Sequence, residues 1–284
     1  MSVPEHRLDE PGVLAQIARL PPLPAVALQL LQSLDDEGAD TERLSRLIAT
    51  DQILAARLLR VANSSFYGMQ GRIHSIRDAV VLIGFRGLRS LALAASVSKA
   101  LSGNCDRLDL CAFWRHGLAA GLAAQELGRR ASLNSDQCFA AGLLHDIGQL
   151  LLARAFPRQF AQVQAWQMKH DCATQEAERA VLGIDHMRIG QLLAEQWRFP
   201  ESLVLAIAGH HDPAMIQHNA HAAVAHVANA IVIALDVDPD ASALVPPIDE
   251  TAWRRFVAST DDLLVILRHV NAQVEAAAGL LPCA

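Results

Sequence analysis

The stretch from residue 142 to residue 152 constrains this chain most, because it places an ionisable pair inside an apolar segment. It reads Gly-Leu-Leu-His-Asp-Ile-Gly-Gln-Leu-Leu-Leu, and nearly every residue around His145 and Asp146 is apolar. A helix that is apolar on all sides is normally buried. Burying a histidine beside an aspartate is costly unless each side chain finds a partner or a metal ion. We therefore expect other segments to supply partners for this pair.

Length and charge bound the class of protein. With 284 residues, 52% of them hydrophobic, the chain can bury a sizeable core in one large or two smaller domains. Its net charge of −6 argues against a general nucleic-acid or anionic-membrane binder. The longest apolar run, 222–235, is too short to cross a bilayer, and the N-terminus is too charged for a secretory signal. The five cysteines include no C-x-x-C pair, which is typical of reduced thiols. We expect a cytoplasmic protein without membrane contact.

Apolar residues recur at spacings of three and four, and strand-like alternation is rare, so the pattern predicts an all-α fold. We expect a two-lobed helical bundle: an N-terminal lobe over 1–104, a second lobe over 105–236, and a C-terminal linker with helices over 237–284. Asp51, Ser75 and Asp261 are expected helix N-caps. In the second lobe and beyond, helices are expected at 109–128, 135–155, 158–170, 174–182, 185–197, 200–211, 219–236, 250–258 and 261–278.

A helix, a short turn at Gly84 and a second helix could form a DNA-reading unit. Nearby positive charge comes from Arg72, Arg77, Arg86 and Arg89. The alternative is two packed helices with solvated arginines. The overall acidity of the chain favours this alternative, so we expect no nucleic-acid partner.

Twelve histidines are present, and several lie inside apolar segments. Single imidazole and carboxylate ligands on separate helices suit Mn, Fe, Co, Ni or Zn. An aspartate that bridges two such metals can hold a hydroxide and polarise a phosphate. A lone buried histidine is more often a hydrogen-bonded core residue, but four apolar segments that each offer one favour a shared site. Spacing alone leaves open whether they converge.

These segments together resemble an HDOD domain, a relative of the HD metal-dependent phosphohydrolases. The resemblance runs in order over about residues 13–235. It is carried by Leu-Pro-Pro-Leu-Pro (20–24), the 51–59 helix, Asn-Ser-Ser-Phe-Tyr-Gly (63–68), 79–84 with Arg86, Trp114 and His116, Gly142–Gly148, Glu178, Gly-Ile-Asp-His (183–186), Trp197 with Pro200, and His210-His211.

The resemblance implies a helical fold with the His-Asp pair in a helix at the centre of the bundle. It also implies a ligand set for one or two divalent transition metals (Fe, Mn, Zn or Ni): His116, His145, Asp146, His186, His210 and His211. Two positions depart from active relatives. Asn229 stands where the last HD aspartate is expected, and Gln149 where a lysine is frequent. A Gly-Tyr-Pro extension, found in related cyclic-di-GMP phosphodiesterases, does not follow His210-His211.

The resemblance implies a signalling protein, since HDOD proteins have generally not been shown to be catalytic. Three functions follow. The preferred one is a non-catalytic signal-transduction module that binds protein partners, with self-association and a nucleotide ligand left open. The second is a metal-dependent phosphohydrolase, in which Asp146 is the catalytic residue. The third is a metal that only holds helices together.

Overall fold

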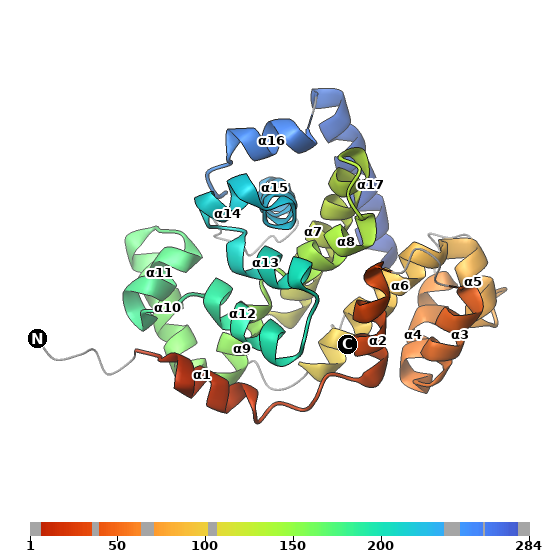
Figure 1. Cartoon of the computed structure of the whole chain (residues 1–284), viewed down its shortest axis with the longest axis horizontal. Coiled ribbons are helices and arrows are strands. Elements are labelled where there is room, and N and C mark those ends of the chain that lie inside the picture. Colours follow the sequence, from red (N-terminus) through yellow and green to blue (C-terminus); the bar gives the residue numbers. More distant parts are fainter. Residues whose placement is uncertain are drawn as a thin grey trace, which may run out of the picture.

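The computed structural model describes residues 7–35, 40–63, 71–101, 107–235, 245–257 and 259–277. Every regular element in these ranges is helical, which confirms the all-α prediction (Figure 1). The elements are α1 (Glu10–Ile17), α2 (Ala25–Gln32), the 3₁₀ turn η1 (Ser33–Asp35), α3 (Thr41–Ala49), α4 (Gln52–Ala62), α5 (Ile76–Ile83), α6 (Phe85–Ala100), α7 (Leu110–Arg130), α8 (Ser135–Leu144), α9 (Ile147–Ala155), α10 (Pro157–His170), α11 (Thr174–Leu182), α12 (His186–Gln196), α13 (Glu201–Gly209), α14 (Pro213–His218), α15 (Ala220–Ala234), α16 (Glu250–Phe256) and α17 (Thr260–Ala277).

Helices α2 to α6 fall in the N-terminal lobe predicted over 1–104, and two of them begin at the predicted caps. Asp51 accepts hydrogen bonds from the first turn of α4, and Ser75 does the same for α5. Gly84 joins α5 to α6 with a φ of 87°, a left-handed conformation that favours glycine. Most of the Asn-Ser-Ser-Phe-Tyr-Gly motif (63–68) lies outside the described residues.

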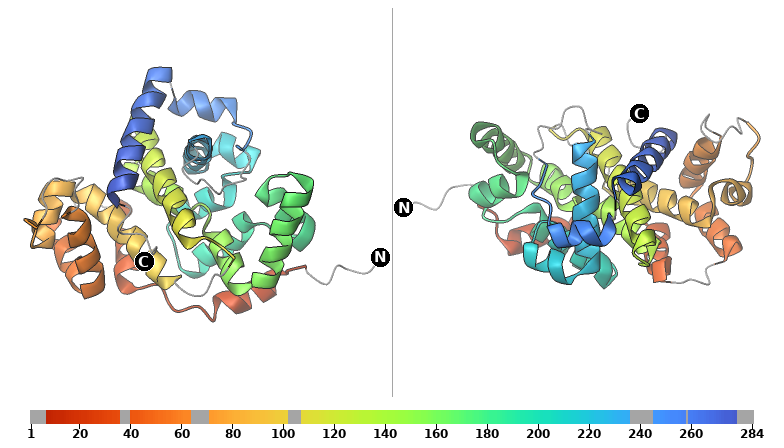
Figure 2. Two further views of the ribbon diagram at one scale, coloured as in Figure 1. Left: turned by 180° about the vertical axis from the view of Figure 1, so that it is seen from behind. Right: turned by 90° about the horizontal axis from the view of Figure 1, so that it is seen from above.

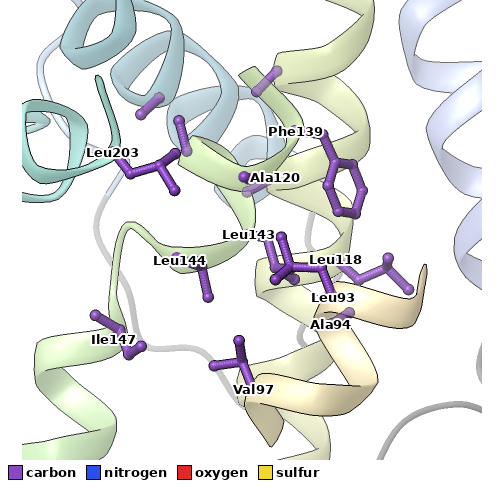
Figure 3. Close-up of a cluster of buried hydrophobic side chains, with 14 of the residues drawn as sticks. Leu93, Ala94, Val97, Leu118, Ala120, Phe139, Leu143, Leu144, Ile147 and Leu203 are labelled. Carbon is purple, nitrogen blue, oxygen red and sulfur yellow. The ribbon is translucent and has the colours of Figure 1, made fainter. Parts of the chain in front are cut away.

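The second lobe is built on a close approach of α7 and α8. A Cβ added to Gly142 would lie 2.4 Å from the Ala120 carbonyl oxygen, so glycine is needed where the two backbones meet. Helix α15 packs against α7, α8 and α13 and is almost completely buried. Figure 3 shows α6 side chains meeting those of α7 and α8, so one apolar core joins the two lobes.

A buried ion pair also joins the lobes and corrects the expectation of solvated arginines for one of the four, Arg89; Arg72, Arg77 and Arg86 are exposed, as expected. Arg89 on α6 is 3% exposed and pairs with Asp136 at the start of α8. Arg89 Nη1 also donates to the Ser33 carbonyl oxygen over 2.6 Å. Asn134, the N-cap residue of α8, donates from its side-chain Nδ2 to the Leu34 carbonyl oxygen over 2.9 Å. Arg89 is therefore unavailable to a nucleic acid. The lobe boundary near residue 104 lies outside the described residues and stays a prediction.

The prediction of one helix over 135–155 is wrong. Helix α8 ends at Leu144, α9 begins at Ile147, and His145 and Asp146 form the turn between them. Adjacent residues in a continuous helix do not face the same point. The break allows both side chains to reach one site. The resemblance implies that the pair lies within one central helix; the structure instead has two helices, α8 and α9, joined by a short turn that carries the pair.

The C-terminal helices cover the second lobe. Figure 2 shows α17, in dark blue, running beside α7, and Arg130 on α7 pairs with Asp262 over 2.5 Å. Ser259 accepts from the Asp262 N–H and so caps α17, which corrects the prediction that Asp261 is the cap.

Two further observations bear on sequence-based expectations. No single described helix is long and apolar enough to span a membrane; only α5 and α6 taken together reach that length and composition, and they meet at 117°.

Cys138 and Cys172 are free thiols, but Cys111 is in a disulfide, contrary to the expectation of reduced cysteines.

Candidate metal centre

The sequence-predicted ligands come from four parts of the second lobe and converge on Asp146. Helix α7 carries His116, the α8–α9 turn carries His145 and Asp146, α12 begins at His186, and the end of α13 supplies His210 and His211. Their donor atoms form two groups, each with all its donor atoms within 4.8 Å of one another. Asp146 belongs to both groups.

The first group joins His116, His145 and Asp146. His145 Nε2 lies 3.1 Å from Asp146 Oδ2, and His116 Nε2 lies 3.8 Å from the same oxygen. The two Nε2 atoms are 3.4 Å apart. Three donors from two separate elements therefore face one point beside Oδ2.

The second group joins Asp146 to His186, His210 and His211. His186 Nε2 and His210 Nε2 each lie 3.4 Å from Asp146 Oδ1 and 3.3 Å from each other. The ring of His211 is 4.3 Å from that of His210 between centroids. Because each oxygen of Asp146 faces a different group, the carboxylate could be shared if a metal ion bound to each group.

Hydrogen bonds at the opposite ring nitrogen orient three of these histidines. His145 Nδ1 contacts the Gly142 carbonyl oxygen at 2.7 Å, and His210 Nδ1 contacts the Ile207 carbonyl oxygen at 3.1 Å. A nitrogen that donates to a carbonyl leaves Nε2 with its lone pair free. This is the usual outer arrangement around metal-binding histidines.

Glu178 on α11 holds the third histidine, a contact that the sequence did not reveal. It is fully buried, and its Oε2 accepts from the His186 backbone N–H over 2.8 Å and contacts Nδ1 at 2.6 Å. The only signal in the sequence is a glutamate eight residues before His186. The carboxylate–histidine pair is a common outer element of metal sites.

The protonation states suit metal binding at most positions. Burial and the neighbouring His145 lower the pKa of His116 to about 4, and burial lowers the pKa of His210 to about 4. Burial also lowers the pKa of His211. Burial alone would raise the pKa of Asp146, but His145 and the other imidazoles hold it well below its usual range. Neutral imidazoles and an ionised carboxylate are the forms that coordinate metals.

His186 differs. Burial alone would lower its pKa, but the Glu178 carboxylate outweighs burial and raises the pKa to about 9. A metal ion must therefore displace a proton from His186.

One buried atom without a hydrogen-bond partner indicates that the residues of the cluster fit a metal ion. Asp146 Oδ1 is buried and has no hydrogen-bond partner among the described residues, although two imidazole nitrogens point at it. A buried unpaired carboxylate oxygen is costly. A divalent cation between these donors would remove that cost, and the nitrogen-rich donor set favours a transition metal.

A cavity of about 350 Å³ opens over the cluster. Gln149 and Asn229 line it with His116, Asp146, His186 and His211, so both pocket residues named from the sequence lie at the site. Two histidines outside the cluster, His226 and His74, are not placed to act as general acids at the site. His226 donates to the His210 carbonyl oxygen and accepts from the Asp249 N–H, and His74 is not among the described lining residues.

Comparison with known proteins identifies the family. The HDOD domain family model matches residues 20–213, and the chain belongs to this family. The HDOD domain protein of unknown function from Geobacter sulfurreducens shares the fold, with 23% identity, a TM-score of 0.74, and coverage of 96% of this chain and 98% of that one.

Two further structures are similar. A candidate phosphohydrolase from Shewanella amazonensis SB2B is 27% identical, with a TM-score of 0.71 and coverage of 94% of this chain and 96% of that one. A candidate signal transduction protein from Marinobacter aquaeolei VT8 is 25% identical, with a TM-score of 0.78 and coverage of 97% of this chain and 62% of that one. An uncharacterised protein from Treponema pallidum is 26% identical over 202 residues. These residues are 69% of this chain but only 38% of that relative's length.

Proposed function

We propose that this chain is a signal-transduction module of the HDOD type whose His/Asp cluster binds one or two divalent transition metal ions without turnover. The observation that carries the metal assignment is the convergence of imidazole Nε2 atoms on both oxygens of Asp146, one of which has no other partner. His116 and His145 would hold one ion, and His186, His210 and His211 the other, with Asp146 shared.

Two features of the pocket support a non-catalytic role. Gln149 and Asn229 are neutral amides at positions where active relatives are expected to carry a lysine and an aspartate. Asp109, the one carboxyl group besides Asp146 among the described lining residues, is occupied in capping α7 through the Cys111 and Ala112 N–H groups, so it is not a free general acid. Signalling through protein partners, and self-association, are part of this proposal; the similarity to the Marinobacter protein supports the signalling role alone.

The second candidate is a metal-dependent phosphohydrolase, favoured by the shared position of Asp146 and by the similarity to the Shewanella protein. A bound divalent metal would polarise a phosphoryl oxygen and lower the pKa of water. This chain's own residues would contribute orientation: Glu178 fixes His186, and the Gly142 and Ile207 carbonyl oxygens fix His145 and His210.

Metal content and turnover separate the candidates. Protein purified without a metal-affinity column is analysed for bound metals, then assayed for phosphodiester hydrolysis with added manganese. Bound metal without hydrolysis supports the proposed module, and hydrolysis that Asp146→Ala abolishes supports the phosphohydrolase. Protein that binds no metal, even when manganese, iron and zinc are supplied, contradicts both.

A further inference from the structure

A second cavity lies outside the His/Asp cluster, where the two lobes meet the last helix. It has a volume of about 400 Å³ and is lined by residues of α5, α6, α7, α8 and α17. None of these residues lines the cavity over the cluster. Figures 1 and 2 show the end of α17 close to α6. The volume is within the range of small-ligand sites, and a ligand there would touch both lobes and α17.

Two arginines from different lobes lie at this cavity. The side chains of Arg86 on α6 and Arg129 on α7 are 65% and 68% exposed. Arg86 Nη1 donates to Ser135 Oγ over 3.0 Å, and Arg129 Nη2 donates to both carboxylate oxygens of Glu126 over 2.8 Å. Each guanidinium is therefore held at one edge and keeps other N–H groups without a hydrogen-bond partner among the described residues.

The ion pairs around the cavity leave one positive charge in excess. Glu126 pairs with Arg130 as well as Arg129, and Arg130 pairs in turn with Asp262. Asp136, which lies 3.8 Å from Arg86 Nε, is already paired with Arg89. A ligand that carries one negative charge would balance the excess. The connected groups are four arginines and three carboxylates: Arg86, Arg89, Arg129 and Arg130 with Glu126, Asp136 and Asp262.

Two buried serine hydroxyls in the same cavity indicate a ligand atom that accepts hydrogen bonds. Ser90 is 6% exposed and Ser135 is 5% exposed, and both line the cavity. Ser90 Oγ makes no hydrogen bond to another described residue. Ser135 Oγ accepts from Arg86, but its own O–H has no acceptor among the described residues. Buried hydroxyls are normally hydrogen-bonded, so both O–H groups are available to a ligand.

The remaining lining is apolar. Leu91, Leu122 and Phe139 are each at most 6% exposed, and they come from α6, α7 and α8. Guanidinium groups bind carboxylates through paired N–H donors, and serine hydroxyls can donate to the same oxygens. An apolar wall beside such donors suits a molecule with an acidic head and an apolar body.

We propose that this cavity binds a small organic carboxylate, with its carboxylate between Arg86, Arg129 and the hydroxyls of Ser90 and Ser135, and its apolar body against Leu91, Leu122 and Phe139. The inference goes beyond the proposed function and does not depend on bound metal. Because the ligand touches both lobes and α17, its binding stabilises their packing against one another.

Octanoate, phenylacetate and cinnamate are the probes, titrated by calorimetry into the full chain after chelator treatment, so that no metal ion can hold the carboxylate. At least one should bind and should raise the melting temperature as its concentration rises. Phenylacetamide, which lacks the charge, and phenyl phosphate, which can carry two charges, should each bind about tenfold or more weakly than phenylacetate.

Three variants change the cavity itself. Ser90→Ala removes one hydroxyl, and Arg129→Gln removes one charge while Arg130 still pairs with Glu126. Each should weaken carboxylate binding about tenfold. Ser90→Leu fills part of the cavity and should abolish binding. Since its side chain enters open space, it should keep the melting temperature of the unliganded protein, so unfolding does not explain the loss.

Two controls match these variants. Ser98 is another buried serine of α6 whose Oγ has no partner among the described residues, but it does not line the cavity. Arg254 on α16 pairs with Glu250 over 2.5 Å and also lies outside the cavity. Ser98→Ala and Arg254→Gln should therefore bind the probes as the wild type does.

Weaker binding in the three cavity variants alone supports the carboxylate site. The inference is wrong if none of the three carboxylates binds the wild type, or if a cavity variant binds them as tightly as the wild type does. Tighter binding of phenyl phosphate than of phenylacetate would also overturn it, because the excess charge would then not select a monoanion. None of these outcomes alters the measurement of metal content.

Discussion

At the scale of single residues, the candidate metal site depends on the hydrogen bonds that orient each predicted ligand. His186 is the clearest case, because Glu178 makes two contacts with it and raises its pKa to about 9. A histidine whose pKa is higher in the folded than in the unfolded protein stabilises the fold fully below the unfolded value, near 6.5. That contribution is lost as the pH rises through about 9. Metal-free protein should therefore lose stability over this range.

Glu178→Gln removes the charge while keeping an acceptor for His186. We expect the stability difference between the wild type and the variant, on the order of 2 kcal/mol in metal-free protein near pH 6, to disappear by pH 10. Metal affinity should also fall, by about 10–100-fold. Melting curves of chelator-treated protein against pH test this. Glu176→Gln, an exposed change on the same helix, is the control. Parallel pH profiles for the wild type and Glu178→Gln would contradict the pairing.

At the scale of elements, helix type and most boundaries were predictable from local chemistry. Helix α5 begins at the predicted cap Ser75, and the α11 range matches the expected one, because Gly183 ends α11 with a φ of 78°. The break at His145-Asp146 was not predictable, because it satisfies contacts from distant segments and leaves no local signal. Helix α1, which the sequence analysis did not propose, is anchored to α12 by Arg188 and Glu10 over 2.8 and 2.9 Å.

Likewise, the sequence supplied the six ligand types and their order, but not their distances or the role of Glu178. Convergence depends on close approaches between helices. A Cβ on Gly148 would lie 1.9 Å from the His186 carbonyl oxygen, so α9 and α12 touch through backbone. The spacing of apolar residues along the sequence does not indicate such a contact.

Gly148→Ala should therefore force α9 away from α12, moving Asp146 relative to His186. We expect destabilisation of more than about 1–3 kcal/mol, because neither backbone can yield as a side chain would. Gly87→Ala is the control. There the nearest atom is the movable Ile83 Cγ2 at 3.0 Å, and alanine improves helix propensity by up to about 1 kcal/mol. Urea unfolding of both variants measures the difference; equal midpoints would contradict the close-contact argument.

At the scale of the whole molecule, the lobes are joined by the apolar core and by the Arg89–Asp136 pair. Breaking a buried pair leaves an uncompensated charge and costs about 3–5 kcal/mol. Arg89→Ala should lower stability by this amount. Arg46→Ala, which removes an exposed pair with Glu42, should change it by about 0.5 kcal/mol or less.

The same variant tests whether the pair couples the lobes. All four tryptophans lie after residue 107, so tryptophan fluorescence follows the second lobe and the C-terminal helices. Circular dichroism follows helices in both lobes. In Arg89→Ala the dichroism transition should begin at lower urea than the fluorescence transition. Coincident transitions at the wild-type midpoint would show that this pair does not hold the lobes together.

The most direct test of the metal centre is anomalous diffraction from crystals grown with manganese, recorded for the wild type and for Asp146→Ala. We expect one or two anomalous peaks beside the Asp146 carboxylate, each within coordination distance of imidazole Nε2 atoms, and none in the variant. Manganese bound elsewhere, or persisting at full occupancy after Asp146 is removed, would contradict it.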